Sequence, residues 1–345
     1  MRLCENPLYI NTLSQQRILI TGGAGFIGSN LVGELLKDER VSHVRVLDNL
    51  ATGSLKNIAE FNGNSKFEFM EGDIRDYDTC VKACKDIDRI THQAALGSVP
   101  RSINDPLTSN NVNITGTLNI FTAAKENNIK RIVYAASSST YGDHPGLPKV
   151  EDVIGNPLSP YAVTKYVNEL YAKVYANLYG IEPIGLRYFN IFGPKQNPAG
   201  PYAAVIPLFA EALLQNKPPV INGDGLHSRD FTFVTNAVSA NVLALFTENK
   251  EATNQVYNIA CGERTTLLEL FEGLKAEAGT ELEPVFGPER RGDVKHSLAD
   301  ISKAKELLGY EPLVSVDSGL RETFKWYKRE IKFNTENAEA RRNTI

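Results

Sequence analysis

Short apolar runs alternate with amphipathic stretches through the first 190 residues of the chain. Stretches such as GFIGSNLVGELLKD and NITGTLNIFTAAKENN repeat apolar residues at spacings of three and four, which predicts helices. Continuous apolar strands separated by helices favour a parallel sheet covered on both faces, and right-handed crossovers make it doubly wound. The predicted strands are RILIT (17–21), HVRVLD (43–48), FEFMEGD (67–73), RITHQAA (89–95), RIVYAAS (131–137) and EPIGLRYF (182–189).

This rhythm weakens after about residue 190. FGPKQNPAGPYAAVIP is rich in Pro and Gly, and the short strands PPVING, FTFV and QVYNIA mix with helices. We therefore expect an α/β protein with a main domain over 15–190 and a smaller mixed α/β lobe over 191–330, with some strand exchange between them. The polar segment 331–345 is expected to be a frayed tail.

Composition excludes several classes of protein. The net charge is −4 and no basic run stands out, so nucleic acid is not an expected partner. The N-terminus lacks the pattern of a secretory signal, and no apolar stretch approaches the ~18 residues of a membrane span. Four scattered cysteines (Cys4, Cys80, Cys84 and Cys261) predict neither a disulfide framework nor a metal site. We expect a cytoplasmic protein without a membrane partner.

A glycine-rich turn follows the first predicted strand, in RILITGGAGFIGSNL. Gly22, Gly25 and Gly28 permit a tight turn and close approach of a pyrophosphate to a helix N-terminus. Asp48 ends the second strand 20 residues beyond Gly28, where a carboxylate binds a ribose 2′-hydroxyl and repels a 2′-phosphate. The pattern predicts NAD rather than NADP. Asp73 ends the third strand, either as a partner of the adenine amino group or as a solvated carboxylate.

The stretch SPYAVTKYVNELY places Tyr161 and Lys165 four residues apart, on one face of a predicted helix. A phenol titrates near 10 when isolated, and a nearby positive charge favours the phenolate, so Tyr161 could act as a base. A packed aromatic residue beside a lysine is the alternative. The strand that ends in AASSSTYGD offers Ser137, Ser138 and Ser139 to hold a substrate oxygen.

Together these motifs resemble the extended short-chain dehydrogenase/reductase family over roughly residues 15–330. The matching segments are TGGAGFIGSN, LDNLATG, GDIRD, HQAA, SSSTYGD, SPYAVTK, LRYFNIFGP and RRGDVKHSLAD. The resemblance implies a Rossmann-like NAD-binding domain and a second lobe that binds a nucleotide sugar. It implies Ser137 as the triad serine, Tyr161 as the base, and Lys165 as the residue that anchors the ribose and lowers the Tyr161 pKa.

The resemblance also implies further site residues. Those expected at the cofactor are Gly22, Gly25, Phe26, Ile27, Gly28, Asp48, Asn49, Gly53, Asp73, Ile74, Gln93, Ala94, Ala95, Tyr161, Lys165 and Tyr188. Those expected at the substrate are Ser98, Ser137, Ser138, Ser139, Tyr161, Asn190, Val205, Arg229, Arg291, Asp293 and Ser297. Among them, Arg229 and Arg291 also have the fork geometry that suits phosphate.

Family branches differ in the reaction that this site performs. The 4,6-dehydratases carry an Asp–Glu pair where this chain has Ser138 and Ser139, and without an added acid the site is expected to move only a hydride and a proton. That favours a 4-epimerase, in which a 4-keto sugar turns over and NAD is regenerated each cycle. Galactose epimerases can hold a tyrosine at the position of Ser297, which would crowd an N-acetyl group.

The resemblance therefore implies interconversion of UDP-GlcNAc and UDP-GalNAc, as in bacterial O-antigen and capsule pathways. A UDP-uronate 4-epimerase and a non-catalytic, NAD-sensing binding protein are the alternatives. The family also implies a homodimer that forms through the helices near 110–126 and 160–178.

Overall fold

A computed structural model describes residues 15–198, 203–289 and 295–342 of the chain, without the side chains of 332–342. Among these residues, no helix is both long enough and apolar enough to cross a membrane.

The centre of the molecule is a parallel sheet in the strand order β11-β6-β5-β4-β1-β2-β3. The order reverses between β1 and β4, which makes the sheet doubly wound, as predicted. All six strands predicted in the first 190 residues are present. The strands of the sheet are β1 (Gln16–Thr21), β2 (Val41–Asp48), β3 (Phe67–Glu71), β4 (Arg89–His92), β5 (Arg131–Ser137), β6 (Glu182–Tyr188) and β11 (Gln255–Ile259).

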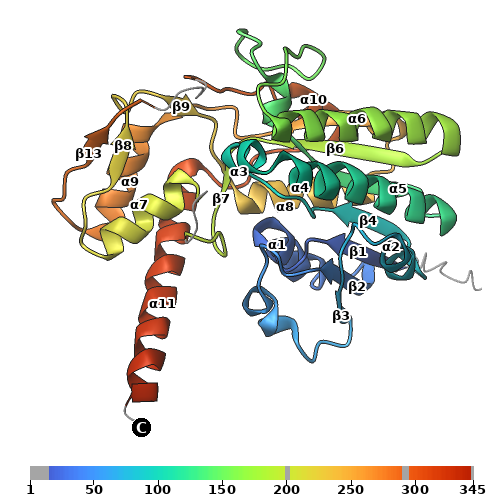
Figure 1. The fold of residues 1–345 in the computed structure, drawn as a ribbon, viewed down its shortest axis with the longest axis horizontal. Coiled ribbons are helices and arrows are strands. Elements are labelled where there is room, and N and C mark those ends of the chain that lie inside the picture. The colour runs from blue at the N-terminus through green and yellow to red at the C-terminus, as the bar shows by residue number, and fades with distance from the viewer. Residues whose placement is uncertain (1–14, 199–202, 290–294, 343–345) are drawn as a thin grey trace, which may run out of the picture.

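Helices cover both faces of this sheet (Figure 1). Neighbouring side chains of β1 alternate between the two faces: Ile18 and Ile20 pack with Leu31 of α1, whereas Leu19 packs with Phe121 of α5. Two apolar cores result, and all five of these side chains are fully buried. The helices are α1 (Phe26–Leu35), α2 (Tyr77–Cys84), α3 (Val99–Asn104), α4 (Pro106–Asn110), α5 (Thr117–Glu126), α6 (Pro160–Tyr179), α7 (Val205–Leu214), α8 (Val234–Phe246), α9 (Leu267–Ala278), α10 (Ser302–Leu308) and α11 (Val316–Arg342).

Short helical segments complete the connections. A π-helix, η3 (Asn111–Gly116), joins α4 to α5. The 3₁₀-helices are η1 (Leu55–Asn57), η2 (Ala59–Phe61), η4 (Ser138–Tyr141) and η5 (Lys250–Ala252).

The sheet takes its last strand from beyond residue 190. β11 pairs in parallel with β6, from Gln255 opposite Ile184 to Ile259 opposite Tyr188. Helix α8 precedes β11 in sequence and packs against β4, β5 and β6. This is the strand exchange expected for the range 191–330, and it brings α8 beneath the main sheet.

Six other elements of that range form what we call the small lobe: α7, α9, β8 (Val220–Asn222), β9 (Ser228–Arg229), β12 (Thr265–Thr266) and β13 (Val285–Gly287). It lies to the left of the sheet in Figure 1. Two short strands, β7 (Ile191–Phe192) and β10 (Thr232–Phe233), pair where the lobe meets the sheet.

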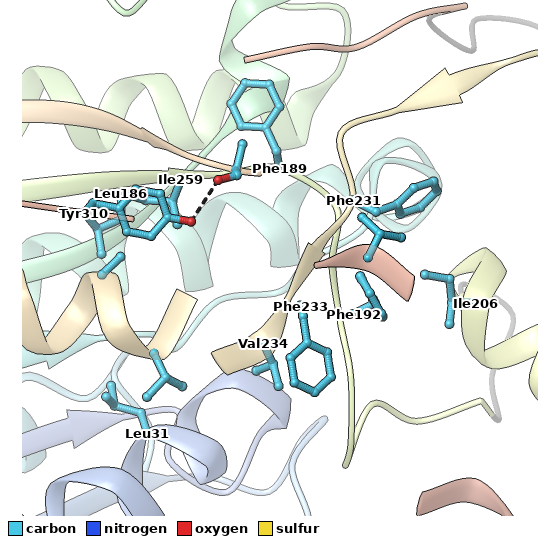
Figure 2. Close-up of a cluster of buried hydrophobic side chains, with 14 of the residues drawn as sticks. Leu31, Leu186, Phe189, Phe192, Ile206, Phe231, Phe233, Val234, Ile259 and Tyr310 are labelled. Carbon is cyan, nitrogen blue, oxygen red and sulfur yellow. Dashed lines mark hydrogen bonds between the residues drawn. The ribbon is translucent and has the colours of Figure 1, made fainter. Parts of the chain in front are cut away.

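One apolar cluster joins the lobe to the sheet (Figure 2). Phe192, Phe231 and Phe233 lie between Ile206 of α7 and Leu31 of α1, and all belong to one buried cluster. Burying a phenylalanine contributes about 1.5–3 kcal/mol to the stability of the fold, so this cluster strongly stabilises the packing of the lobe against the sheet. In the same cluster, the Tyr310 hydroxyl donates to the Ala260 carbonyl at 2.8 Å.

The C-terminal segment differs from the prediction. Helix α11 runs to Arg342, through most of the range 331–345 that was expected to be frayed, and it projects from the body in Figure 1. After Gly319 the helix contains neither Gly nor Pro, so no residue of its own sequence ends it.

Candidate active site

The glycine turn between β1 and α1 has no room for side chains. Gly22 has φ 71°, and a Cβ placed there would lie 2.7 Å from the Ala94 backbone nitrogen. A Cβ on Gly28 would lie 2.2 Å from the Gly22 carbonyl oxygen. The turn is therefore packed backbone to backbone at the N-terminus of α1, which is the cradle that a dinucleotide pyrophosphate requires.

Asp48 ties this turn to the end of β2. Its carboxylate accepts N–H bonds from Ala24 at 2.9 Å and from Leu50 at 2.8 Å. Burial raises the pKa of Asp48, and the two N–H donors oppose that shift. The carboxylate lines the cavity at the position where a ribose hydroxyl would be bound, so these residues fit NAD.

Asp73 lies beside Asp48 in the same cavity. It accepts hydrogen bonds from Arg75 and from the Asn49 amide, and the bond to Arg75 is the main cause that lowers its pKa to about 2. It is thus ionised and partly paired rather than simply solvated.

The cofactor cavity has a volume of about 430 Å³ and runs from Asp48 to Lys165 along the carboxyl edge of the sheet. Of the residues predicted at the cofactor, one does not line it: Gly53 lies against Ala24, where a Cβ would meet the Ala24 carbonyl carbon at 2.8 Å, and it borders a separate cavity. The predicted residues in the lining are Gly22, Gly25, Phe26, Ile27, Gly28, Asp48, Asn49, Asp73, Ile74, Gln93, Ala94, Ala95, Tyr161, Lys165 and Tyr188.

Local sequence fixes the start of α6 and thereby the place of Tyr161. Ser159 caps the helix by accepting the Ala162 N–H at 3.2 Å, and Pro160 occupies the first turn. The Tyr161 N–H, which has no partner within the helix, donates to the Ser102 hydroxyl at 3.0 Å. Tyr161 and Lys165 then share one helical face and both line the cofactor cavity.

Ser137 is the hydroxyl that meets Tyr161. It ends β5, accepts a hydrogen bond from the Ser139 hydroxyl at 2.9 Å, and lies in the cofactor cavity. Burial raises the pKa of Tyr161 and the hydrogen bond with Ser137 lowers it. Ser138 lines neither this cavity nor the next one.

Lys165 lies in the cofactor cavity and is hydrogen-bonded to the backbone. Its Nζ donates to the Ala135 carbonyl at 2.9 Å and lies 6.0 Å from the centre of the Tyr161 ring. Burial lowers the pKa of Lys165 to about 8. Burial is the main cause that shifts the pKa of both groups, and the effect of Lys165 on the Tyr161 pKa stays a prediction.

A second cavity, of about 660 Å³, adjoins the first and separates the sheet edge from the small lobe. Ser98, Val205 and Arg229, which are among the residues predicted at the substrate, line it, and Asn190 lines both cavities together with Ile191. The site therefore consists of two chambers with a shared wall, and Ser137 and Tyr161 stand on the cofactor side of it.

Three of the described residues predicted at the substrate line neither chamber, namely Ser138, Ser139 and Ser297. Ser297 is half-buried, and its N–H donates to the carbonyl of Ser228, the neighbour of Arg229, at 3.1 Å. It lines neither chamber among the described residues. Arg291 and Asp293 lie outside the described residues.

Sequence reasoning missed Asp230, which organises this edge of the lobe. Its carboxylate accepts N–H bonds from Cys261 at 2.9 Å, Gly262 at 3.1 Å and Ala299 at 3.2 Å. Its carbonyl accepts the Asn190 amide at 3.2 Å. Burial raises the pKa of Asp230 to about 7. The available signal was an acidic residue within the apolar run DFTFV.

The comparisons with known proteins agree with this geometry. A family model described as the NAD dependent epimerase/dehydratase family matches residues 18–260. A putative UDP-glucose 4-epimerase of Methanocaldococcus jannaschii is 41% identical over 313 residues, which cover 90% of this chain and 98% of the relative.

Two solved structures extend the similarity to the fold. A UDP-N-acetylglucosamine 4-epimerase from Methanobrevibacter ruminantium M1, in complex with UDP-N-acetylmuramic acid, matches with a TM-score of 0.86 at 40% identity, over 92% of this chain and 99% of the other. A UDP-glucuronic acid 4-epimerase from Bacillus cereus, in complex with UDP-glucuronic acid and NAD, matches with a TM-score of 0.84 at 34% identity, over 91% and 99%.

Proposed function

Since the chain belongs to the NAD-dependent epimerase/dehydratase family, we propose that it interconverts UDP-GlcNAc and UDP-GalNAc by inverting C4 of the sugar. It is an isomerase of the UDP-sugar 4-epimerase kind, and NAD is its cofactor.

The two-chamber geometry carries this proposal. Asn190 and Ile191 form a wall common to the cofactor cavity and the lobe cavity, and Ser137 and Tyr161 line the cofactor side, so a sugar bound at this wall would lie near them. Arg229 lines the lobe cavity, and its guanidinium can bind a diphosphate through two parallel N–H bonds. A sugar nucleotide therefore fits with its diphosphate in the lobe and its sugar at the shared wall.

The residues of the chain have distinct tasks in the reaction. The glycine turn and Asp48 would hold NAD, which would supply a reversible hydride acceptor for sugar C4. Tyr161 accepts the proton of the 4-hydroxyl and returns it, and Ser137 holds the sugar oxygen by hydrogen bonding to it and to the phenol. Lys165 supplies a buried positive charge at the same edge, which favours the phenolate when it turns from Ala135 toward the site.

Ser297 supports the choice of an N-acetylated sugar. It follows the strand bridge of Ser228 with His296, so it lies next to the segment that carries Arg229. Ser297 itself lines neither chamber, and it is the resemblance that implies that a tyrosine at this position would crowd an N-acetyl group. The similarity to a UDP-N-acetylglucosamine 4-epimerase is consistent with that choice.

The first test is to incubate the purified protein with UDP-GlcNAc, without added cofactor, and to follow the anomeric protons by NMR. We expect UDP-GalNAc to appear and the same ratio to be approached from UDP-GalNAc. UDP-glucose should turn over poorly. Replacing Ser297 (S297Y) should abolish turnover of the N-acetylated sugars, and an unchanged rate in that variant would refute the pocket argument.

A UDP-uronate 4-epimerase is the second candidate, because a UDP-glucuronic acid 4-epimerase shares the fold at 34% identity. Turnover of UDP-glucuronic acid in place of UDP-GlcNAc would select it. No turnover of any UDP-sugar by a protein that retains NAD would instead support a binding protein.

We also propose a homodimer formed through α6 and its neighbours. Val163, Leu170, Val174 and Leu178 are each 46% or more exposed and recur at spacings of seven and four, so they form one apolar stripe on α6. Sedimentation should show a dimer. L170E should dissociate it; a monomeric parent would contradict the proposal.

A further inference from the structure

Asn241 lies on α8 beneath the cofactor cavity and is fully buried. Its amide nitrogen donates to the Tyr188 hydroxyl at 2.7 Å. Its amide oxygen accepts from the Gln93 amide at 2.9 Å and from the Thr91 hydroxyl at 3.1 Å. The remaining amide hydrogen goes to the Ala237 carbonyl at 2.8 Å, so the side chain is fully paired.

The partners of Asn241 belong to the cofactor cavity. Gln93 follows β4, and Tyr188 ends β6 directly opposite Ser137 of β5. Both side chains line the cavity at its Tyr161 end, away from Asp48, and the Tyr188 hydroxyl donates to Gln93 at 3.0 Å. Three hydrogen bonds thus close a ring among Asn241, Gln93 and Tyr188.

We infer that Asn241 is a positioning residue for the reacting end of the cofactor. It acts through Gln93 and Tyr188, whose polar ends it fixes under that part of the cavity, and it touches neither substrate nor cofactor itself. The inference rests on the proposed function only for its kinetic readout, because retention of NAD can be measured whatever the sugar is.

The physical reason is that both partners could otherwise turn. A free glutamine side chain has several rotamers, and a buried amide or phenol left without a partner is destabilising, which favours rearrangement. A displacement of 1 Å at reacting atoms can cost about 100-fold in rate, so greater freedom of Gln93 and Tyr188 would affect the chemical step.

Helix α8 offers a matched control. Asn236 is also a fully buried asparagine, one turn and a half earlier; it donates to the Val314 carbonyl at 2.8 Å and accepts the N–H groups of Leu313 at 2.8 Å and Val314 at 3.0 Å. It lines neither chamber of the site. N236A and N241A should therefore destabilise the fold to a similar degree.

The experiment compares N241A, N236A and the parent for melting temperature, for NAD retained through gel filtration, and for kcat and KM with the UDP-sugar. We expect similar melting temperatures for the two variants. N241A should lose at least about tenfold in kcat with little change in KM, and it should retain less NAD. N236A should match the parent in both. Equal losses of NAD retention in N241A and N236A would overturn the inference.

A second variant keeps the test decisive where N241A folds poorly. N241L fills the same space without hydrogen bonds, and Y188F removes one partner hydroxyl. The loss of NAD retention in the N241L/Y188F double variant should be smaller than the product of the single losses, since both changes break the same ring. Multiplicative losses would overturn the inference. Normal NAD retention by every variant of a protein inactive on all UDP-sugars would overturn both it and the proposed function.

Discussion

The cofactor half and the small lobe each contain a buried carboxylate that holds backbone N–H groups, and the two are used differently. Asp48 joins Ala24 and Leu50, which belong to consecutive segments of one βαβ unit. Asp230 joins Cys261, Gly262 and Ala299, which come from distant parts of the chain. In the cofactor half, the carboxylate therefore holds neighbouring segments of the chain together. In the lobe, the carboxylate holds together segments that are far apart in sequence.

The difference indicates that function depends on a local sequence motif in the cofactor half and on contacts between distant segments in the lobe. In the cofactor half a single added methyl group should be decisive. In the lobe, substitutions should have smaller effects, on the affinity for the substrate and on the pH dependence of stability. Four predictions test this contrast.

Gly28→Ala should have the largest effect. Its Cβ would lie 2.2 Å from the Gly22 carbonyl oxygen, so the turn must open and the protein should be purified without NAD and without activity. Gly33→Ala is the control on the same helix, because its Cβ meets only the tip of the Phe61 ring at 3.2 Å. G28A protein that still carries NAD would contradict the close-packed turn.

Tyr161→Phe should lower kcat by roughly 10²–10⁴-fold, the usual contribution of a positioned acid–base group. NAD content, measured by absorbance after release from the protein, should stay at the parental level because the ring still lines the cavity. Turnover at the parental rate would remove Tyr161 from the role of base.

Arg229→Met should raise KM for the UDP-sugar by about 10–100-fold, the effect of losing a charged hydrogen bond, with kcat changed less. Lys295→Met removes the same charge from a nearby exposed side chain that lines neither chamber, and it should leave KM unchanged. A KM shift of equal size in both variants would mean that Arg229 acts only through its positive charge and not through a direct contact with the substrate.

The smallest effect should be a pH dependence of stability from Asp230. Burial raises its pKa from 3.8 to about 7, so its contribution to stability is full below pH 4 and is lost as the pH rises through 7. A shift of this size corresponds to at most about 4 kcal/mol. Between pH 5 and 8 the melting temperature of the parent should fall relative to that of D230N, whereas D300N should follow the parent. Parallel curves for the parent and D230N would disprove the assignment.

The sequence predicts the sheet well because its strands are continuous apolar runs with helices between them. The six strands from RILIT to EPIGLRYF are all present, as is the seventh, QVYNIA. The hydrophobic pattern does not determine which strands pair. The pairing of β11 with β6 depends on tertiary structure, which local periodicity does not predict. The helix through residue 342 was missed because polar composition was given more weight than the lack of helix-breaking residues.

The residues that line the cofactor cavity could be predicted because they lie in or directly beside strand ends and turns, where spacing determines position. Gly53 is the exception, since it packs on the turn instead of lining the cavity. In the lobe, Arg229 and Val205 could be predicted only by resemblance, and Asp230 and Asn241 were missed altogether. A buried polar residue on an apolar helix or strand indicates a partner, but not which one.

The late arrival of β11 has a consequence for how the protein is made. A ribosome that has just released β6 must add the chain from Tyr188 to Gln255 before β11 can pair, which takes several seconds at roughly 5–20 residues per second. Until then β6 is an open sheet edge, and the face that α8 covers is bare. The nascent chain is therefore prone to aggregation over this interval, when a chaperone could shield the open edge.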